Sequence, residues 1–174
     1  GEHADPDERV RLGGVSVWLR HESALWRAMP AWADAMVDSP AMLGFAAKRS
    51  GMTQPNELGS LTVDMLRGAG TPLEASLVRF ARTLAEDRRP DVVILSNALL
   101  LGLAKPLKDA LGVPVVCSLQ GEAPFVEALG EPHRTEAWRA ARASAAHVDA
   151  WVSVSAWHAD VMAPLLEVAR DRID

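Results

Sequence analysis

The sequence predicts an α/β domain in which helices alternate with the strands of a mostly parallel sheet. Three observations support this prediction. Short apolar runs stand at 92–95, 113–119 and 150–154, turn residues bound each run, and segments of helical periodicity lie between them. A strand, a helix and a further strand in this order form a right-handed crossover between parallel neighbours. We therefore expect a three-layer, Rossmann-like domain.

The second half of the chain, 71–174, has the clearer pattern. The capping box Thr71-Pro72-Leu73-Glu74 begins a helix that runs to Arg88-Arg89. The run 92–95 is continuously apolar, so we expect a strand buried on both faces. The next helix spans 99–111, with a mild kink at Pro106 and a cap at Gly112.

The remaining elements follow in the same order. The strand 113–119 is followed by one or two helical turns over 123–129 and by a long helix over 134–147. After the strand 150–154, Ser155 caps the last helix.

The first half, 1–70, has a looser pattern. The pair Gly13-Gly14 precedes a strand at 15–19, and a string of short helices follows, the last of them between Asn56 and Gly68. We interpret 1–70 as this strand plus a helical insertion. Together with the alternating core of 71–174 it would form one domain over 1–174.

Composition excludes several classes of protein. The 174 residues include 18 basic and 23 acidic side chains, a net charge of −5, and no basic stripe of the kind that binds nucleic acid. No apolar run approaches the roughly 18 residues that span a bilayer. The polar N-terminus is not a signal peptide, and the single Cys117 forms no internal disulfide. We expect a cytoplasmic protein, and association with a membrane surface stays open.

Polar residues follow each strand of the second half at its carboxyl end. Open parallel sheets bind ligands at this edge. The sequence therefore predicts a binding site there, with Gln120 and Glu122 as candidate catalytic residues. The predicted binding residues are Ser96, Asn97, Gln120, Gly121, Glu122, Ser153, Ser155 and His158.

These residues allow a structural interpretation as well. Asn97 and Ser155 are good helix caps whether or not a ligand binds. Glu122, which we expect to be exposed, would then only accept hydrogen bonds from loop amides. Gly121 favours a ligand, because its lack of a side chain lets backbone approach closely. His158 falls in the first turn of a helix at the same edge.

The sequence lacks the motifs that several classes of enzyme and nucleotide-binding protein require. There is no G-x-G-x-x-G after a strand, no Walker loop and no G-x-S-x-G elbow. The five histidines are scattered, so we predict no metal site. Cys117 lies within an apolar strand and is expected in the core rather than at a reaction centre.

The order and spacing of motifs in the second half resemble a known family. The segments are 89–97, 101–104, 111–116, 119–122, 148–150, 153–155 and 171–173. Together they are similar to the N-terminal, acceptor-side domain of the family 4 (group 1) glycosyltransferases. The resemblance covers 89–174 well and 13–70 more loosely.

This resemblance implies half of a GT-B fold, in which two Rossmann-like domains face a cleft. The family implies a retaining transferase in carbohydrate biosynthesis that takes a sugar from a nucleotide-sugar and needs no metal or other cofactor. The acceptor, a sugar or other small molecule, would bind this domain, and the nucleotide-sugar a C-terminal donor domain of the full-length protein.

Two departures modify that expectation. The glycine-rich loop that opens family members is not found before Gly13-Gly14, and Arg172-Ile173-Asp174 falls near the expected interdomain linker. We therefore expect an excerpt of a longer enzyme that is inactive alone and self-associates through exposed sheet edges. Family members often carry histidine where this chain has Gln120, so a catalytic role is not transferred directly.

Two alternatives remain at this stage. One is a non-catalytic α/β binding or interaction domain. The other is a domain of a different GT-B enzyme, such as a sugar epimerase.

Overall fold

The computed structural model describes residues 55–87 and 89–174. The chain divides into two compact units, 1–52 and 53–174, and the second is the one described below. The strand expected at 15–19 and the short helices expected before residue 52 lie outside the described residues. The expected single-domain organisation over 1–174 stays a prediction.

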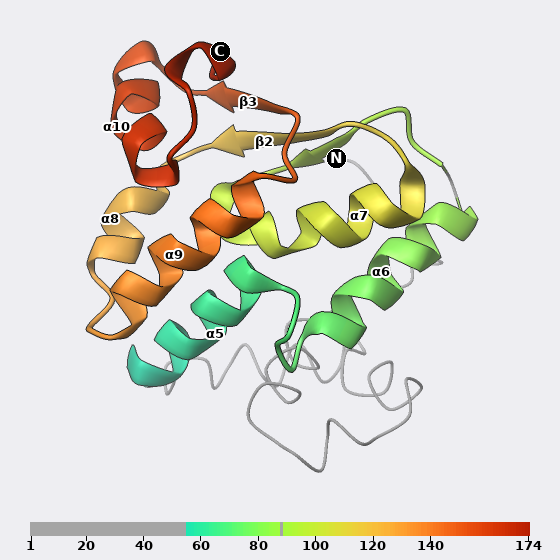
Figure 1. The fold of residues 1–174 in the computed structure, drawn as a ribbon, viewed down its shortest axis with the longest axis horizontal. Coiled ribbons are helices and arrows are strands. Elements are labelled where there is room, and N and C mark those ends of the chain that lie inside the picture. The colour runs from blue at the N-terminus through green and yellow to red at the C-terminus, as the bar shows by residue number, and fades with distance from the viewer. Residues whose placement is uncertain (1–54, 88) are drawn as a thin grey trace, which may run out of the picture. The chain divides into compact units, whose positions relative to one another are not determined.

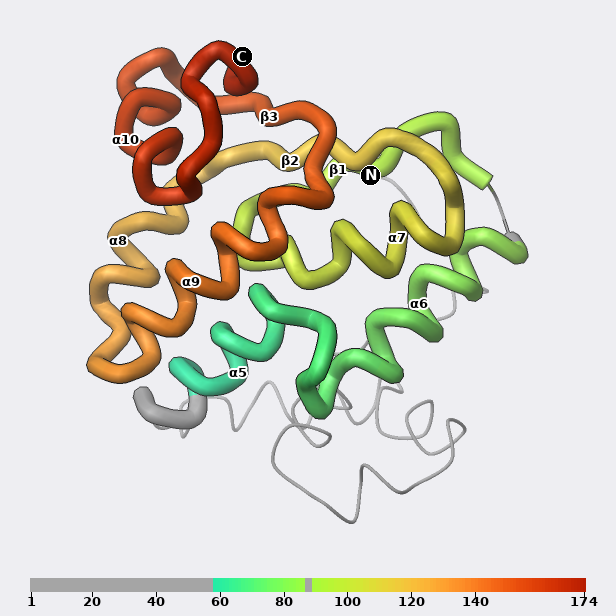
Figure 2. The backbone as a smooth tube through the Cα atoms, in the orientation of Figure 1, coloured from blue at the N-terminus to red at the C-terminus, as the bar shows by residue number. Residues whose placement is uncertain are grey.

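A three-stranded parallel sheet forms one layer of this unit, and most of the helices lie below it in the view of Figures 1 and 2. Its strands are β1 (Val93–Leu95), β2 (Val115–Leu119) and β3 (Ala150–Ser153), and they lie in that order. In the register Leu95 pairs with Cys117, which in turn pairs with Trp151. The α/β fold class and the parallel pairing predicted from the sequence are confirmed.

Helices precede, connect and follow the strands as the periodicity indicated (Figure 1). Before the sheet come α5 (Pro55–Arg67) and α6 (Glu74–Asp87). The 3₁₀ helix η2 (Ala98–Leu103) and α7 (Ala104–Leu111) connect β1 to β2. The other elements are α8 (Glu122–Glu127), α9 (His133–Ala145), α10 (Ala156–Leu166) and the 3₁₀ helix η3 (Arg170–Arg172).

The two faces of the sheet differ in burial. Leu95, Cys117 and Trp151, which share one rung, are buried in the core. On the opposite face Ile94 is 65% exposed and Val152 is 47% exposed. The expectation that 92–95 would be buried on both faces was therefore wrong. A continuous apolar run carries no information about which face is covered.

The segment after β1 differs from the single helix expected over 99–111. Its first part is the 3₁₀ helix η2, and the α-helix begins at Ala104. Pro106 thus lies in the first turn of α7, where an amide donor is not needed, and the kink argument does not apply. Gly112 caps the helix with a φ of 64°, as predicted.

A close backbone contact joins the end of α5 to η2. Gly68 has a φ of 66°, and a Cβ atom placed on it would lie 2.4 Å from the carbonyl oxygen of Gly102. A Cβ atom on Gly102 would lie 2.2 Å from the carbonyl oxygen of Met65. Real Cβ atoms do not approach backbone this closely, so both positions require glycine.

Asp149 links the start of β2 to the turn before β3. Its Oδ2 accepts a hydrogen bond from the amide of Val115 at 2.9 Å, and its Oδ1 accepts one from Lys108 Nζ at 2.6 Å. The bond from Lys108 is the main cause that lowers the pKa of Asp149, and the bond from Val115 adds to it.

Asp149→Asn should therefore destabilise the protein in a pH-dependent way. A depressed carboxyl pKa contributes stability above the ordinary value of 3.8, and this contribution is lost as the pH falls through the folded-state pKa. The free energy of unfolding of the wild type should exceed that of the variant at neutral pH. In urea titrations the gap should narrow below about pH 5. A gap independent of pH would contradict this role.

Candidate functional site at the carboxyl edge of the sheet

The three predicted polar clusters lie at one edge of the sheet. Because β1, β2 and β3 are parallel neighbours, the residues that follow them share the carboxyl edge. These are 96–97 after β1, 120–122 after β2 and 154–158 after β3. Whether they bind a ligand stays a prediction.

The side chain of Glu122 joins the ends of β1 and β2. Its Oε1 accepts a hydrogen bond at 2.7 Å from the amide of Ala98, which is the first residue of η2 and follows β1. Its Oε2 accepts from the amides of Gln120 at 3.0 Å and Gly121 at 2.9 Å. We call these three amides, of Ala98, Gln120 and Gly121, the amide cradle. One carboxylate thus satisfies the first amide of η2 and two amides of the turn that precedes α8.

Glu122 is 4% exposed, so the expectation of an exposed carboxylate was wrong. The reason is local geometry. The chain turns sharply after β2, and Glu122, the first residue of α8, reaches back to the turn and to the neighbouring strand end. A buried carboxylate requires such partners. The structural interpretation, in which Glu122 accepts from loop amides, matches this geometry. A catalytic role for Gln120 or Glu122 stays a prediction.

His158, which follows β3, lies next to Glu122. It lies in the first turn of α10, is 6% exposed, and has its Nε2 atom 3.9 Å from Glu122 Oε2. This nitrogen is buried without a hydrogen-bond partner. The position at the edge agrees with the sequence prediction, but the imidazole faces the interior of the protein.

Asn97 and Ser155 both cap helices. Asn97 Oδ1 accepts from the amide of Leu99 at 3.0 Å, and Ser155 Oγ accepts from the amide of His158 at 3.2 Å. This is the structural role that the sequence offered for both residues. These capping bonds hold both side chains in place at the carboxyl edge.

The other predicted residues are more accessible. Ser96, Gln120 and Gly121 are exposed, and Ser153 is half-buried. Gln120 Nε2 donates to Ser118 Oγ at 2.8 Å, which leaves its Oε1 facing no described partner. Gln120 is therefore the long polar side chain that this edge offers to a ligand.

Cys117 is a core residue, as predicted. It is fully buried beneath this edge, and burial, with a smaller contribution from the nearby Glu122 carboxylate, raises the pKa of the thiol to about 12. A thiol of this kind is not a nucleophile at neutral pH.

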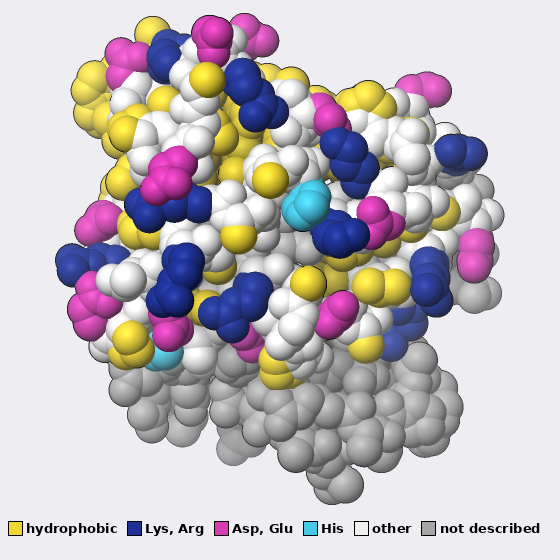
Figure 3. All heavy atoms as spheres, in the orientation of Figure 1, with side chains coloured by type: hydrophobic (Ala, Val, Ile, Leu, Met, Phe, Trp, Pro, Cys, Tyr) yellow, Lys and Arg dark blue, Asp and Glu magenta, His cyan; other side chains and the backbone are white. Residues whose placement is uncertain are grey.

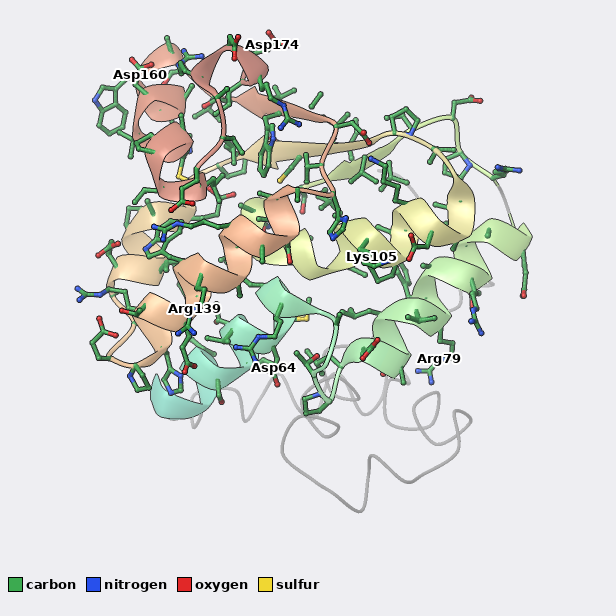
Figure 4. The ribbon with its side chains drawn as sticks, viewed as in Figure 1. Asp64, Arg79, Lys105, Arg139, Asp160 and Asp174 are labelled. Carbon is green, nitrogen blue, oxygen red and sulfur yellow. The ribbon has the colours of Figure 1, made fainter. Side chains whose placement is uncertain are left out.

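Sequence reasoning missed a cleft of about 350 Å³ between the helices. Residues from the ends of α5 and α9, from η2, from the first half of α6 and from α7 line it, and none of the predicted site residues contributes. Lys105 of α7 borders it and is paired with Asp109 (Figure 4). The cleft depends on how α5, α6, η2, α7 and α9 pack, and no local motif signals that arrangement.

The described residues also bear on metals and membranes. Residues 55–87 and 89–174 hold no group of three His, Cys, Asp or Glu side chains that could bind a metal ion. Among the helices of this region, none combines the length and apolar character needed to cross a bilayer.

Basic and acidic side chains alternate over the face drawn in Figure 3, where no extended patch of one sign is visible.

Comparison with known proteins identifies the family. Neither a curated protein nor a solved structure matches the chain. The family model described as a glycosyl transferase 4-like domain matches residues 2–174. This match covers almost the whole sequence, and the parallel α/β fold agrees with a Rossmann-like half of a GT-B enzyme. The chain therefore belongs to the glycosyl transferase 4-like domain family.

Proposed function

We propose that this chain is the acceptor-side domain of a retaining glycosyltransferase that moves a sugar from a nucleotide-sugar to an acceptor hydroxyl. The observation that carries the proposal is the family match over residues 2–174. In the reaction, the acceptor oxygen forms a bond to the anomeric carbon, the bond from that carbon to the nucleotide diphosphate breaks, and the acceptor proton leaves to a base.

The geometry of the carboxyl edge supports an acceptor site there. Sugar hydroxyls both donate and accept hydrogen bonds, and the exposed polar side chains at this edge carry hydroxyls and a carboxamide. The apolar side chains of Val154 and Trp157 are exposed beside them. Gln120 offers a carbonyl oxygen and an amide, while Ser96 and Ser155 offer hydroxyls. Such neutral groups suit a neutral, hydroxyl-bearing ligand.

In this proposal Gln120 contacts the acceptor and Glu122 is a positioning residue. Glu122 acts through the amide cradle, because it fixes the backbone of Gln120 and Gly121 relative to the start of η2. An accurately held backbone is what brings an acceptor hydroxyl into line with the donor.

The rest of the proposal follows the family. The nucleotide-sugar is a co-substrate held by a donor domain outside residues 1–174, the reaction uses no metal or other cofactor, and the enzyme acts in the cytoplasm on a sugar or other small acceptor. Residues 1–174 alone would be inactive. Exposed apolar side chains on the sheet, such as Ile94 and Val152, favour self-association of this isolated part.

Gln120→Ala in the full-length enzyme tests the acceptor site. The substitution removes an exposed side chain whose described hydrogen bond is to Ser118, so stability should change by no more than about 0.5 kcal/mol. Loss of one hydrogen bond to the acceptor should raise the acceptor KM about fivefold. The donor KM should stay unchanged. Steady-state kinetics with each substrate varied in turn measures both.

Arg139→Ala is the matched control. Arg139 is an exposed residue of α9, on the part of that helix near α5 (Figure 4). Its replacement should leave both KM values unchanged. A rise in the donor KM for Gln120→Ala, or no change in either KM, would contradict an acceptor site at this edge.

A further inference from the structure

The amide cradle is already occupied by a negative charge. Backbone amides that follow parallel strands and begin helices are the usual binding place for phosphate and carboxylate groups of ligands. Here the Glu122 carboxylate accepts from all three cradle amides at 2.7 to 3.0 Å. The carboxylate is 4% exposed, so it lies inside this edge rather than on its surface.

In the described part of the chain, the residues that form this edge include no Lys or Arg, and the nearby Arg170 is paired with Asp160. Within 96–98, 120–124 and 154–158, the described residues from each strand end into the following helix, there is no Lys or Arg. Arg170 approaches with its Nη2 3.4 Å from the carbonyl oxygen of Ala156, but its Nε is paired with Asp160 and its Nη1 donates to Ile173. His158 faces Glu122 from α10, with the 3.9 Å separation given above.

From these observations we propose that Glu122 is a built-in anion that makes the acceptor site select neutral, hydroxyl-bearing ligands against phosphorylated or carboxylated ones. The selection rests on the proposed function, in which the acceptor binds at this edge. An anionic group placed here would find the cradle amides engaged and would be repelled by the carboxylate. Hydroxyl groups meet no such penalty and can bond to Gln120, Ser96 and Ser155.

The carboxylate selects by exclusion, because it disfavours the binding of anionic ligands and needs no contact with a neutral one. A glutamate at this position therefore combines two roles. It holds the ends of β1 and β2 together, and it removes the anion site that the same backbone would otherwise present.

The experiment uses inorganic phosphate as the anionic probe and the full-length enzyme labelled with ²H and ¹⁵N. In wild type, phosphate should leave the amide resonances of Ala98, Gln120 and Gly121 unmoved. In Glu122→Ala the cradle is vacant, and phosphate should shift these resonances with an affinity at least about tenfold higher than in wild type. Sodium chloride at matched ionic strength controls for screening.

Two further variants keep the test decisive. Glu86→Gln removes an exposed carboxylate from the last turn of α6 and should leave phosphate binding as in wild type. If Glu122→Ala does not fold, Glu122→Gln, which keeps an accepting oxygen but no charge, must bind phosphate more tightly than wild type does. Phosphate shifts in wild type equal to those in the variant, or no phosphate binding by either Glu122 variant, would overturn the proposal.

Glucose, a neutral hydroxyl-bearing probe, separates this inference from the proposed function. Shifts at the resonances of Ser96, Gln120 and Ser155 with glucose, together with the phosphate result above, support both. If glucose shifts these residues and wild type also binds phosphate at the cradle, the selectivity is overturned and the acceptor site stands. If glucose shifts none of them, the result counts against an acceptor site at this edge and overturns the selection inferred for it.

Discussion

Gly102→Ala is expected to lower the free energy of unfolding by about 3 kcal/mol or more, because the new methyl group would overlap backbone atoms on a neighbouring element. Its Cβ would lie 2.2 Å from the carbonyl oxygen of Met65 and 2.7 Å from the amide nitrogen of Gly68. Neither atom belongs to a flexible side chain, so α5 and η2 would have to separate. Urea denaturation followed by circular dichroism measures the loss.

Gly130→Ala is the control for this variant. A Cβ atom on Gly130 would meet nothing within 4 Å, so that variant should stay within about 0.5 kcal/mol of wild type. If Gly102→Ala were as stable as Gly130→Ala, the close contact between α5 and η2 would be wrong.

Glu122→Ala is expected to destabilise the protein by about 3 kcal/mol, since it leaves the cradle amides without an acceptor and each unsatisfied buried donor costs about 1–3 kcal/mol when water does not replace the bond. For a chain of 174 residues this corresponds to a fall of about 6–12 °C in Tm. Differential scanning calorimetry measures the change.

Glu122→Gln separates the contribution of the side chain's shape to stability from the contribution of its charge. It keeps one accepting oxygen, so its Tm should lie between those of wild type and Glu122→Ala. A loss below about 0.5 kcal/mol for Glu122→Ala, the value typical of exposed surface positions, would show that the cradle does not depend on Glu122.

The sequence predicted the strands and their order well, for a physical reason. The apolar runs that became β1, β2 and β3 are bounded by turn residues, and helices of clear periodicity connect them. Caps are local too. Asn97, Gly112 and Ser155 each end or begin a helix through contacts with residues a few positions away.

The features that sequence reasoning missed depend on contacts between distant segments. Glu122 is buried because the amide of Ala98, 24 positions earlier, reaches the same point as the turn after β2. The exposure of Ile94 depends on which face of the sheet the helices cover. The need for glycine at 102 comes from α5, which no pattern around Gly102 reveals.

The most direct test of the proposed function follows a labelled sugar from a nucleotide-sugar donor to an acceptor hydroxyl. The full-length enzyme is assayed beside residues 1–174, and NMR reads the anomeric configuration of the product. We predict transfer with retained configuration by the full-length enzyme and none by residues 1–174, because donor and acceptor must be held together across two domains. Inverted product, or turnover by residues 1–174 alone, would contradict the assignment of this chain as the acceptor side of a retaining glycosyltransferase.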